Sequence, residues 1–81
     1  MFFKELRIRR KYNKVIQILG DNRMFKRCKS IKAVSMAGKD QQAQRMLNQV
    51  KIEFGSALSA AGVKKEEFEY MMENFERWGK K

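Results

Sequence analysis

The chain has 81 residues, 43% of them hydrophobic, and carries 19 Lys and Arg against 9 Asp and Glu. This length supports one modest core, so we expect a single domain over residues 1–81. A lone cysteine excludes an internal disulfide, the lack of histidine excludes the usual zinc ligand sets, and no apolar run reaches the ~20 residues that span a membrane.

The first two predicted helices are separated by a glycine. Residues 4–19 carry one apolar stripe at the four-three-four spacing of a helix face: Ile8, Tyr12, Val15 and Leu19. Gly20 then starts a break. Residues 23–36 carry a thinner stripe, formed by Met24, Cys28, Ile31 and Ser35 and widened by Phe25 and Val34. We expect the Cys28 thiol to be buried on this stripe rather than reactive.

Two further helices are predicted in the second half of the chain. Residues 41–61 hold the clearest apolar face, formed by Ala43, Met46, Leu47, Val50, Phe54, Ala57, Leu58 and Ala61. Asp40 is placed to cap the start of this helix, and Gly62 suits the left-handed residue after its end. Residues 64–78 hold an apolar face and five glutamates mostly opposite it: Glu66, Glu67, Glu69, Glu73 and Glu76. The fold class that follows is all-α, a small bundle of three to four amphipathic helices.

A β-hairpin is the competing interpretation of the first half. Residues 15–19 and 23–25 are rich in β-branched and aromatic residues, and they flank a Gly-Asp-Asn turn. Alternation fails beyond this stretch, whereas the helical stripe of residues 8–19 accounts for more residues. We therefore favour helices.

The positive charge is confined to one half of the chain. Residues 1–39 hold 12 Lys and Arg against 2 Asp and Glu, a net charge of +10, whereas residues 40–81 hold 7 of each sign and are neutral. A block of this sign and density attracts phosphates or carboxylates. The alternative is a solvated face that keeps the protein in solution, although solubility alone does not require the charges to be segregated.

Ten cations of the basic half are the candidate binding residues. Four of them line one side of the first helix at intervals of three, four and three: Lys4, Arg7, Lys11 and Lys14. Arg10 adds charge further round, and the second helix contributes Arg23, Lys26, Arg27, Lys29 and Lys32. If the two helices are antiparallel neighbours, they pool these side chains into one patch that suits phosphate contacts.

Other interpretations of the polar and aromatic residues are weaker. A helix-turn-helix would place Gln41, Gln42, Gln44 and Arg45 at the start of a recognition helix, but the expected apolar spacing around the turn is not met. Tyr12 is expected in the core rather than as a platform for stacked bases. Phe2 and Phe3, if exposed, would anchor a partner or a second copy of the chain. Lipid binding by the first helix has no other support.

The glutamates of the last helix allow two arrangements. They form an ordinary solvated face, or they lie against the basic half of the same chain or of a neighbouring subunit. The second arrangement is compatible with a homodimer.

Catalysis is not expected, because there is no histidine to act as a general base and no glycine-rich phosphate loop. We expect a cytoplasmic, non-enzymatic binding protein without cofactor or metal, in a regulatory or accessory role, and not at a membrane. The favoured partner is nucleic acid, DNA or RNA. The alternative is a small adaptor or inhibitor that docks on an acidic surface of a larger protein or complex, and a weaker option is a cationic pocket for a phosphorylated ligand.

Overall fold

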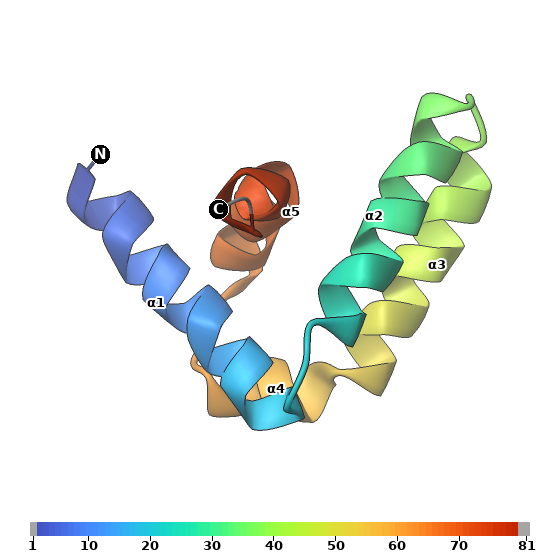
Figure 1. Cartoon of the computed structure of the whole chain (residues 1–81). Helices are drawn as coiled ribbons and strands as arrows, with labels where there is room; N and C mark the ends of the chain where they lie inside the picture. The colour runs from blue at the N-terminus through green and yellow to red at the C-terminus, as the bar shows by residue number, and fades with distance from the viewer. Residues whose placement is uncertain (1, 80–81) are drawn as a thin grey trace.

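The computed structural model describes residues 2–79, without the side chain of Phe2, and residues 2–79 contain no β-strand. Five helices follow one another along the chain (Figure 1): α1 (Phe2–Leu19), α2 (Arg23–Met36), α3 (Asp40–Glu53), α4 (Gly55–Ala60) and α5 (Lys65–Gly79). The all-α prediction is confirmed. The hairpin alternative is wrong, because residues 15–19 and 23–25 are helical.

Three of the breaks lie at glycines, as the sequence predicts. Gly20, Gly38 and Gly62 adopt φ values of +83°, +85° and +72°. A residue with a Cβ atom is disfavoured in this left-handed region, so glycine ends α1, α2 and α4 at a low conformational cost.

The third predicted helix, residues 41–61, is wrong in one respect, because it is two helices. The helical hydrogen-bonding pattern is interrupted at Phe54, although its amide still donates to the carbonyl of Val50 at 2.9 Å. The next residue is Gly55, and glycine is a poor helix former. Because the chain changes direction at this break, α4 packs against α1. The side chain of Phe54 remains buried in the core. Residues 2–79 therefore form five helices rather than three to four.

Asp40 does not cap α3 in the predicted way. The helix includes Asp40, and the preceding Lys39 occupies the cap position without a side-chain hydrogen bond to the helix. The Asp40 carboxylate instead accepts a hydrogen bond from the Ser35 hydroxyl at 3.0 Å, which ties α3 to the end of α2.

The helices form two arms with α5 between them (Figure 1). α2 and α3 lie side by side as an antiparallel hairpin, and α1 forms the other arm, packing on α5 and α4. α1 and α2 diverge from the turn at residues 20–22. The condition under which their cations would form one patch, that α1 and α2 are antiparallel neighbours, is therefore not met, because α5 lies between them.

Aromatic side chains close the core where the arms meet. The rings of Tyr12 and Phe25 have centroids 4.6 Å apart, Trp78 lies 5.3 Å from Tyr12, and Phe75 lies 5.6 Å from Phe25. All four residues are buried, as is Cys28. Within residues 2–79, no helix combines the length and the apolar character needed to cross a membrane.

Candidate functional site

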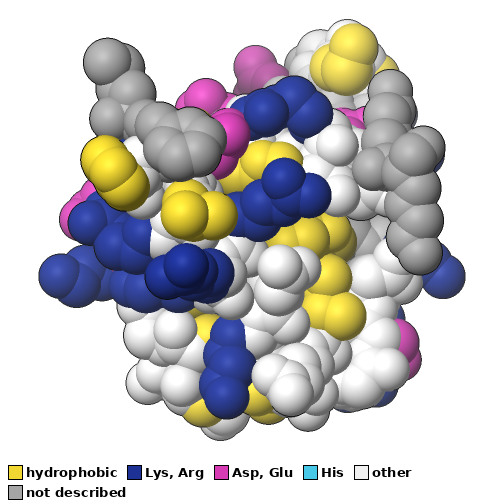
Figure 2. Space-filling view, turned by 60° about the vertical axis from the view of Figure 1, so that its left-hand side comes forward, with side chains coloured by type: hydrophobic (Ala, Val, Ile, Leu, Met, Phe, Trp, Pro, Cys, Tyr) yellow, Lys and Arg dark blue, Asp and Glu magenta, His cyan; other side chains and the backbone are white. Residues whose placement is uncertain are grey.

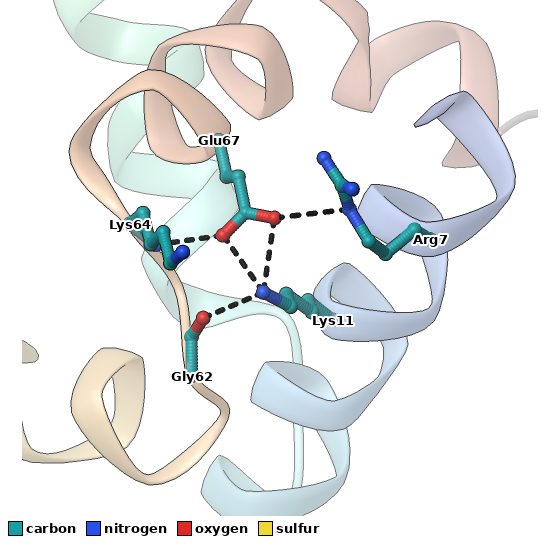
Figure 3. A network of polar contacts seen from close by, with 5 residues as sticks. All are labelled: Arg7, Lys11, Gly62, Lys64 and Glu67. Atoms are coloured by element: carbon teal, nitrogen blue, oxygen red, sulfur yellow. Dashed lines mark hydrogen bonds and ion pairs between the residues drawn. The ribbon is translucent and has the colours of Figure 1, made fainter. Parts of the chain in front are cut away.

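One cation of the candidate set, the half-buried Lys11, is bound by a buried carboxylate. Glu67, only 3% exposed, accepts hydrogen bonds from the Lys11 ammonium at 2.8 and 2.9 Å and from the Lys64 amide at 2.9 Å (Figure 3). Lys11 also donates to the Gly62 carbonyl at 2.8 Å, and the Arg7 guanidinium approaches Glu67 at 3.4 Å. Lys11 thus links α1 to the start of α5. Its positive charge is largely neutralised by the Glu67 carboxylate.

The same contacts explain the acidity of Glu67. Burial acts to raise the pKa of its carboxyl, but the hydrogen bonds from Lys11 and Lys64 and the charges of Lys11 and Arg7 outweigh it, so the pKa is lowered. Glu67 is therefore ionised at neutral pH. The expectation that the glutamates of the last helix lie on an outer face is wrong for Glu67.

Other candidate cations have acidic or aromatic neighbours at the surface. Lys32 pairs with Glu76 at 2.9 Å and Arg23 with Asp21 at 3.5 Å, while Arg27 pairs with Glu53. The Lys4 ammonium lies 5.4 Å from the centre of the Tyr70 ring. The three exposed ion pairs contribute little stability, but each neutralises part of the predicted positive surface.

The last helix therefore lies partly against the basic half of the same chain. Glu67 and Glu76 pair with cations of α1 and α2, which is one of the two arrangements that the sequence allowed. Glu66, Glu69 and Glu73 are exposed, as on an ordinary outer face.

Five candidate residues remain exposed and outside the ion pairs found within residues 2–79: Lys4, which lies over the Tyr70 ring, and Arg10, Lys14, Lys26 and Lys29. Arg9 is also exposed, and its charge acts on Tyr12, whose pKa is raised by burial in spite of it. Arg9 was not among the candidate residues. It lies one helical turn before Tyr12, on the side of α1 that carries this buried ring.

These exposed cations form two groups rather than one patch of ten. On α1, Arg10 and Lys14 follow Arg7 at helical spacing on the outer side of the helix. On α2, Lys26 and Lys29 line a hollow of about 340 Å³ whose other side comes from α1 and α5. Figure 2, which turns the α1 side of the molecule forward, shows Lys and Arg side chains across much of this face, with a dense group at its left.

Apolar side chains lie beside the α1 group. Phe3 is 81% exposed, and Leu6, one turn further on, is 39% exposed. Phe3, Arg7, Arg10 and Lys14 share one side of α1, because their spacings are four, three and four residues. Phe3 is therefore exposed, which is the condition for the anchoring role considered from the sequence, while the side chain of Phe2 lies outside the described part of the structure.

The α2–α3 hairpin does not have the geometry of a helix-turn-helix. In that motif the two helices meet at about 90–120°, whereas α2 and α3 are antiparallel and packed along their length (Figure 1). Gln41, Gln44 and Arg45 are exposed at the start of α3, and Gln44 donates to the Asn48 side chain at 3.2 Å. This arrangement favours an exposed polar turn of a structural hairpin.

Within residues 2–79, no group of three or more Cys, Asp and Glu side chains is arranged to hold a metal ion. Burial raises the pKa of the Cys28 thiol to about 11 despite the nearby charge of Arg27, so the thiol is protonated at neutral pH. Comparisons with models of protein families, with curated proteins and with solved structures found no match for this chain.

Proposed function

We propose that this chain is a small basic binding protein that engages nucleic acid mainly through its phosphate backbone, in a regulatory or accessory role. The observation that carries the proposal is the surplus of exposed cations on α1 and α2 after the internal ion pairs have formed. The binding residues are Arg10, Lys14, Lys26 and Lys29, with the partly paired Arg7.

The spacing of the α1 group supports contact with a linear polyanion. Arg7 and Lys14 lie seven residues apart, which is about 10 Å along a helix, with Arg10 between them. Side chains in such a row reach successive phosphates, and a protein that neutralises several phosphates gains affinity from the release of counterions.

The buried aromatic residues of the basic half favour phosphate contact over base stacking. Tyr12 and Phe25, interleaved with the basic residues in the sequence, are buried and already pack against other rings. Aromatic platforms need an exposed ring face, so these two residues are not available to bases. We therefore expect weak dependence on base sequence and strong dependence on salt.

Charge-neutralising variants test the assignment. Arg10→Gln/Lys14→Gln and Lys26→Gln/Lys29→Gln each remove two cations from one group, and Lys39→Gln/Arg45→Gln removes two exposed cations near the tip of the α2–α3 hairpin as a matched control. Fluorescence anisotropy with labelled duplex DNA, single-stranded DNA and RNA should show weaker binding for the first two variants and a smaller effect for the control. Equal losses in all three variants would show that only net charge matters and would contradict the assigned surface.

A second function, docking on an acidic protein surface, is favoured by one observation. Phe3 and Leu6 are exposed beside Arg7 and Arg10, and apolar anchors next to Arg are typical of protein interfaces. In this case Phe3→Ser abolishes association with the protein partner and leaves oligonucleotide binding unchanged. Light scattering on the wild type and on Phe3→Ser distinguishes a homodimer from a complex with another protein.

A further inference from the structure

A groove with apolar walls and a basic end runs between α3, α4 and α5. Its first part is a hollow of about 310 Å³ lined by Leu58, Val63 and Phe68, with Lys51, Lys64 and Lys65 around it. It continues along α5 as a hollow of about 600 Å³, which shares Lys51, Lys65 and Phe68 and adds apolar surface from Leu47 and Met72. None of these residues belongs to the cations proposed to bind nucleic acid.

The groove offers apolar surface that the fold leaves incompletely covered. Leu47, Leu58, Val63 and Met72 pack against the core but are only partly buried. An apolar ligand that covers them removes further surface from water, which is favourable by about 25 cal/mol for each Å². The volumes are also within the usual range of ligand pockets, about 300–1,000 Å³.

Positive charge is concentrated at the α4 end of the groove. The Lys51 ammonium lies 5.8 Å from the centre of the Phe68 ring, and Lys64 and Lys65 are exposed on the segment that starts α5. Of the two acidic residues that follow them, Glu67 is turned into its contacts with Lys11 (Figure 3), and Glu66 is exposed, lines neither hollow and is in no ion pair within residues 2–79. Glu69 and Glu73 line only the larger hollow, and neither is in an ion pair within residues 2–79.

We propose that this groove binds a small organic anion with an aliphatic body, of the class of medium-chain carboxylates. The hydrocarbon lies on Leu58, Val63 and Phe68, and the carboxylate is held by Lys51 and Lys65 at the basic end. An inorganic phosphate would leave the apolar walls exposed, and a neutral apolar compound would leave the lysines without a partner. Only an amphiphilic anion matches both features, and its binding is independent of the proposed nucleic-acid function.

The test is a titration of the full chain with hexanoate, octanoate and decanoate, each below its micelle-forming concentration, followed by calorimetry and by amide chemical shifts. Each added methylene should tighten binding about fourfold until the groove is filled, because burial of one CH₂ contributes about 0.8 kcal/mol. The shifted amides should lie within residues 47–72. Affinity that is independent of chain length, or shifts centred on α1 and α2, would overturn the proposal.

Two comparisons separate a specific site from general attraction of an anion to a basic protein. Lys51→Gln/Lys65→Gln should weaken octanoate binding at least tenfold, whereas Lys26→Gln/Lys29→Gln, with the same loss of charge on α2, should leave it unchanged. Octanol, which lacks the charge, should bind the wild type and the Lys51→Gln/Lys65→Gln variant equally weakly. Equal effects of the two double variants on octanoate would overturn the assignment of the lysines.

Discussion

The buried ion pair between Glu67 and Lys11 predicts a large and specific effect of mutation on stability. In Lys11→Met, the Glu67 carboxylate stays buried but loses two of its hydrogen bonds, keeping the Lys64 amide and the more distant Arg7 guanidinium. Removing one partner of a buried pair costs about 3–5 kcal/mol. Because the Lys11 side chain is 24% exposed and Arg7 compensates in part, we expect the lower value of about 2–3 kcal/mol.

This loss should be visible as a change of about 10–20 °C in the midpoint of thermal unfolding, at about 4–8 °C for each kcal/mol in a domain of this size. In the double variant Lys11→Met/Glu67→Leu, both charges are replaced by apolar side chains, and such replacements are often neutral or stabilising. The double variant should therefore be more stable than Lys11→Met alone, and the coupling energy of the pair should be at least about 1.5 kcal/mol.

The assay is chemical unfolding of the wild type, the two single variants and the double variant, followed by circular dichroism. The cycle Lys32→Met/Glu76→Leu is the matched control, because this pair is exposed and its coupling energy should be below about 1 kcal/mol.

The stabilisation by Glu67 should also depend on pH. Since the pKa of Glu67 is lowered in the folded state, its contribution to the free energy of unfolding is present above its ordinary pKa of 4.5 and is lost as the pH falls through the folded value. Additive single effects, or a difference in stability between wild type and Glu67→Gln that does not shrink as the pH falls below 4.5, would refute this reasoning.

Three further predictions concern the core and the turns. The thiol of Cys28, with its pKa raised to about 11 by burial, should resist Ellman's reagent at pH 8 until denaturant is added, and rapid labelling of the native protein would contradict its burial. Met71→Ala should destabilise the protein by about 2–5 kcal/mol, because Met71 is fully buried, and a loss below about 1 kcal/mol in urea unfolding would show a poorly packed site. Gly62→Ala should lower the free energy of unfolding by about 1 kcal/mol, because the φ of Gly62 is +72°. Gly55→Ala should be neutral or stabilising in the same assay, because an added Cβ atom meets open space within a helix. The reverse order of the two effects would refute the assigned conformations.

Local patterns were sufficient to predict the helices and most of their ends. The second helix was expected at residues 23–36 and is found at Arg23–Met36, because its flanking residues break the helix on both sides. The break at Phe54 was missed, since the apolar stripe of residues 43–61 continues through it at helical spacing. Gly55 was the available signal, but one glycine within a helical pattern does not by itself require a break.

The candidate site was less accessible to sequence reasoning, because charge pairing depends on contacts between distant segments. Lys11 and Glu67 lie 56 residues apart, and Lys32 and Glu76 lie 44 residues apart. The sequence predicts which residues are cationic, but only the tertiary arrangement decides which of them are neutralised. The divergence of α1 and α2, which divides the cations into two groups, follows from the insertion of α5 and has no local signal in residues 1–39.

The proposed binding of nucleic acid makes a quantitative prediction about salt. If Arg7, Arg10, Lys14, Lys26 and Lys29 each contact one phosphate, the logarithm of the association constant for duplex DNA should fall with the logarithm of salt concentration with a slope of about −4 to −5. The measurement is fluorescence anisotropy from about 50 to 200 mM salt, and Arg10→Gln/Lys14→Gln should reduce the slope by about two. A slope near zero, or no binding at the lowest salt, would contradict the proposal and favour a protein partner.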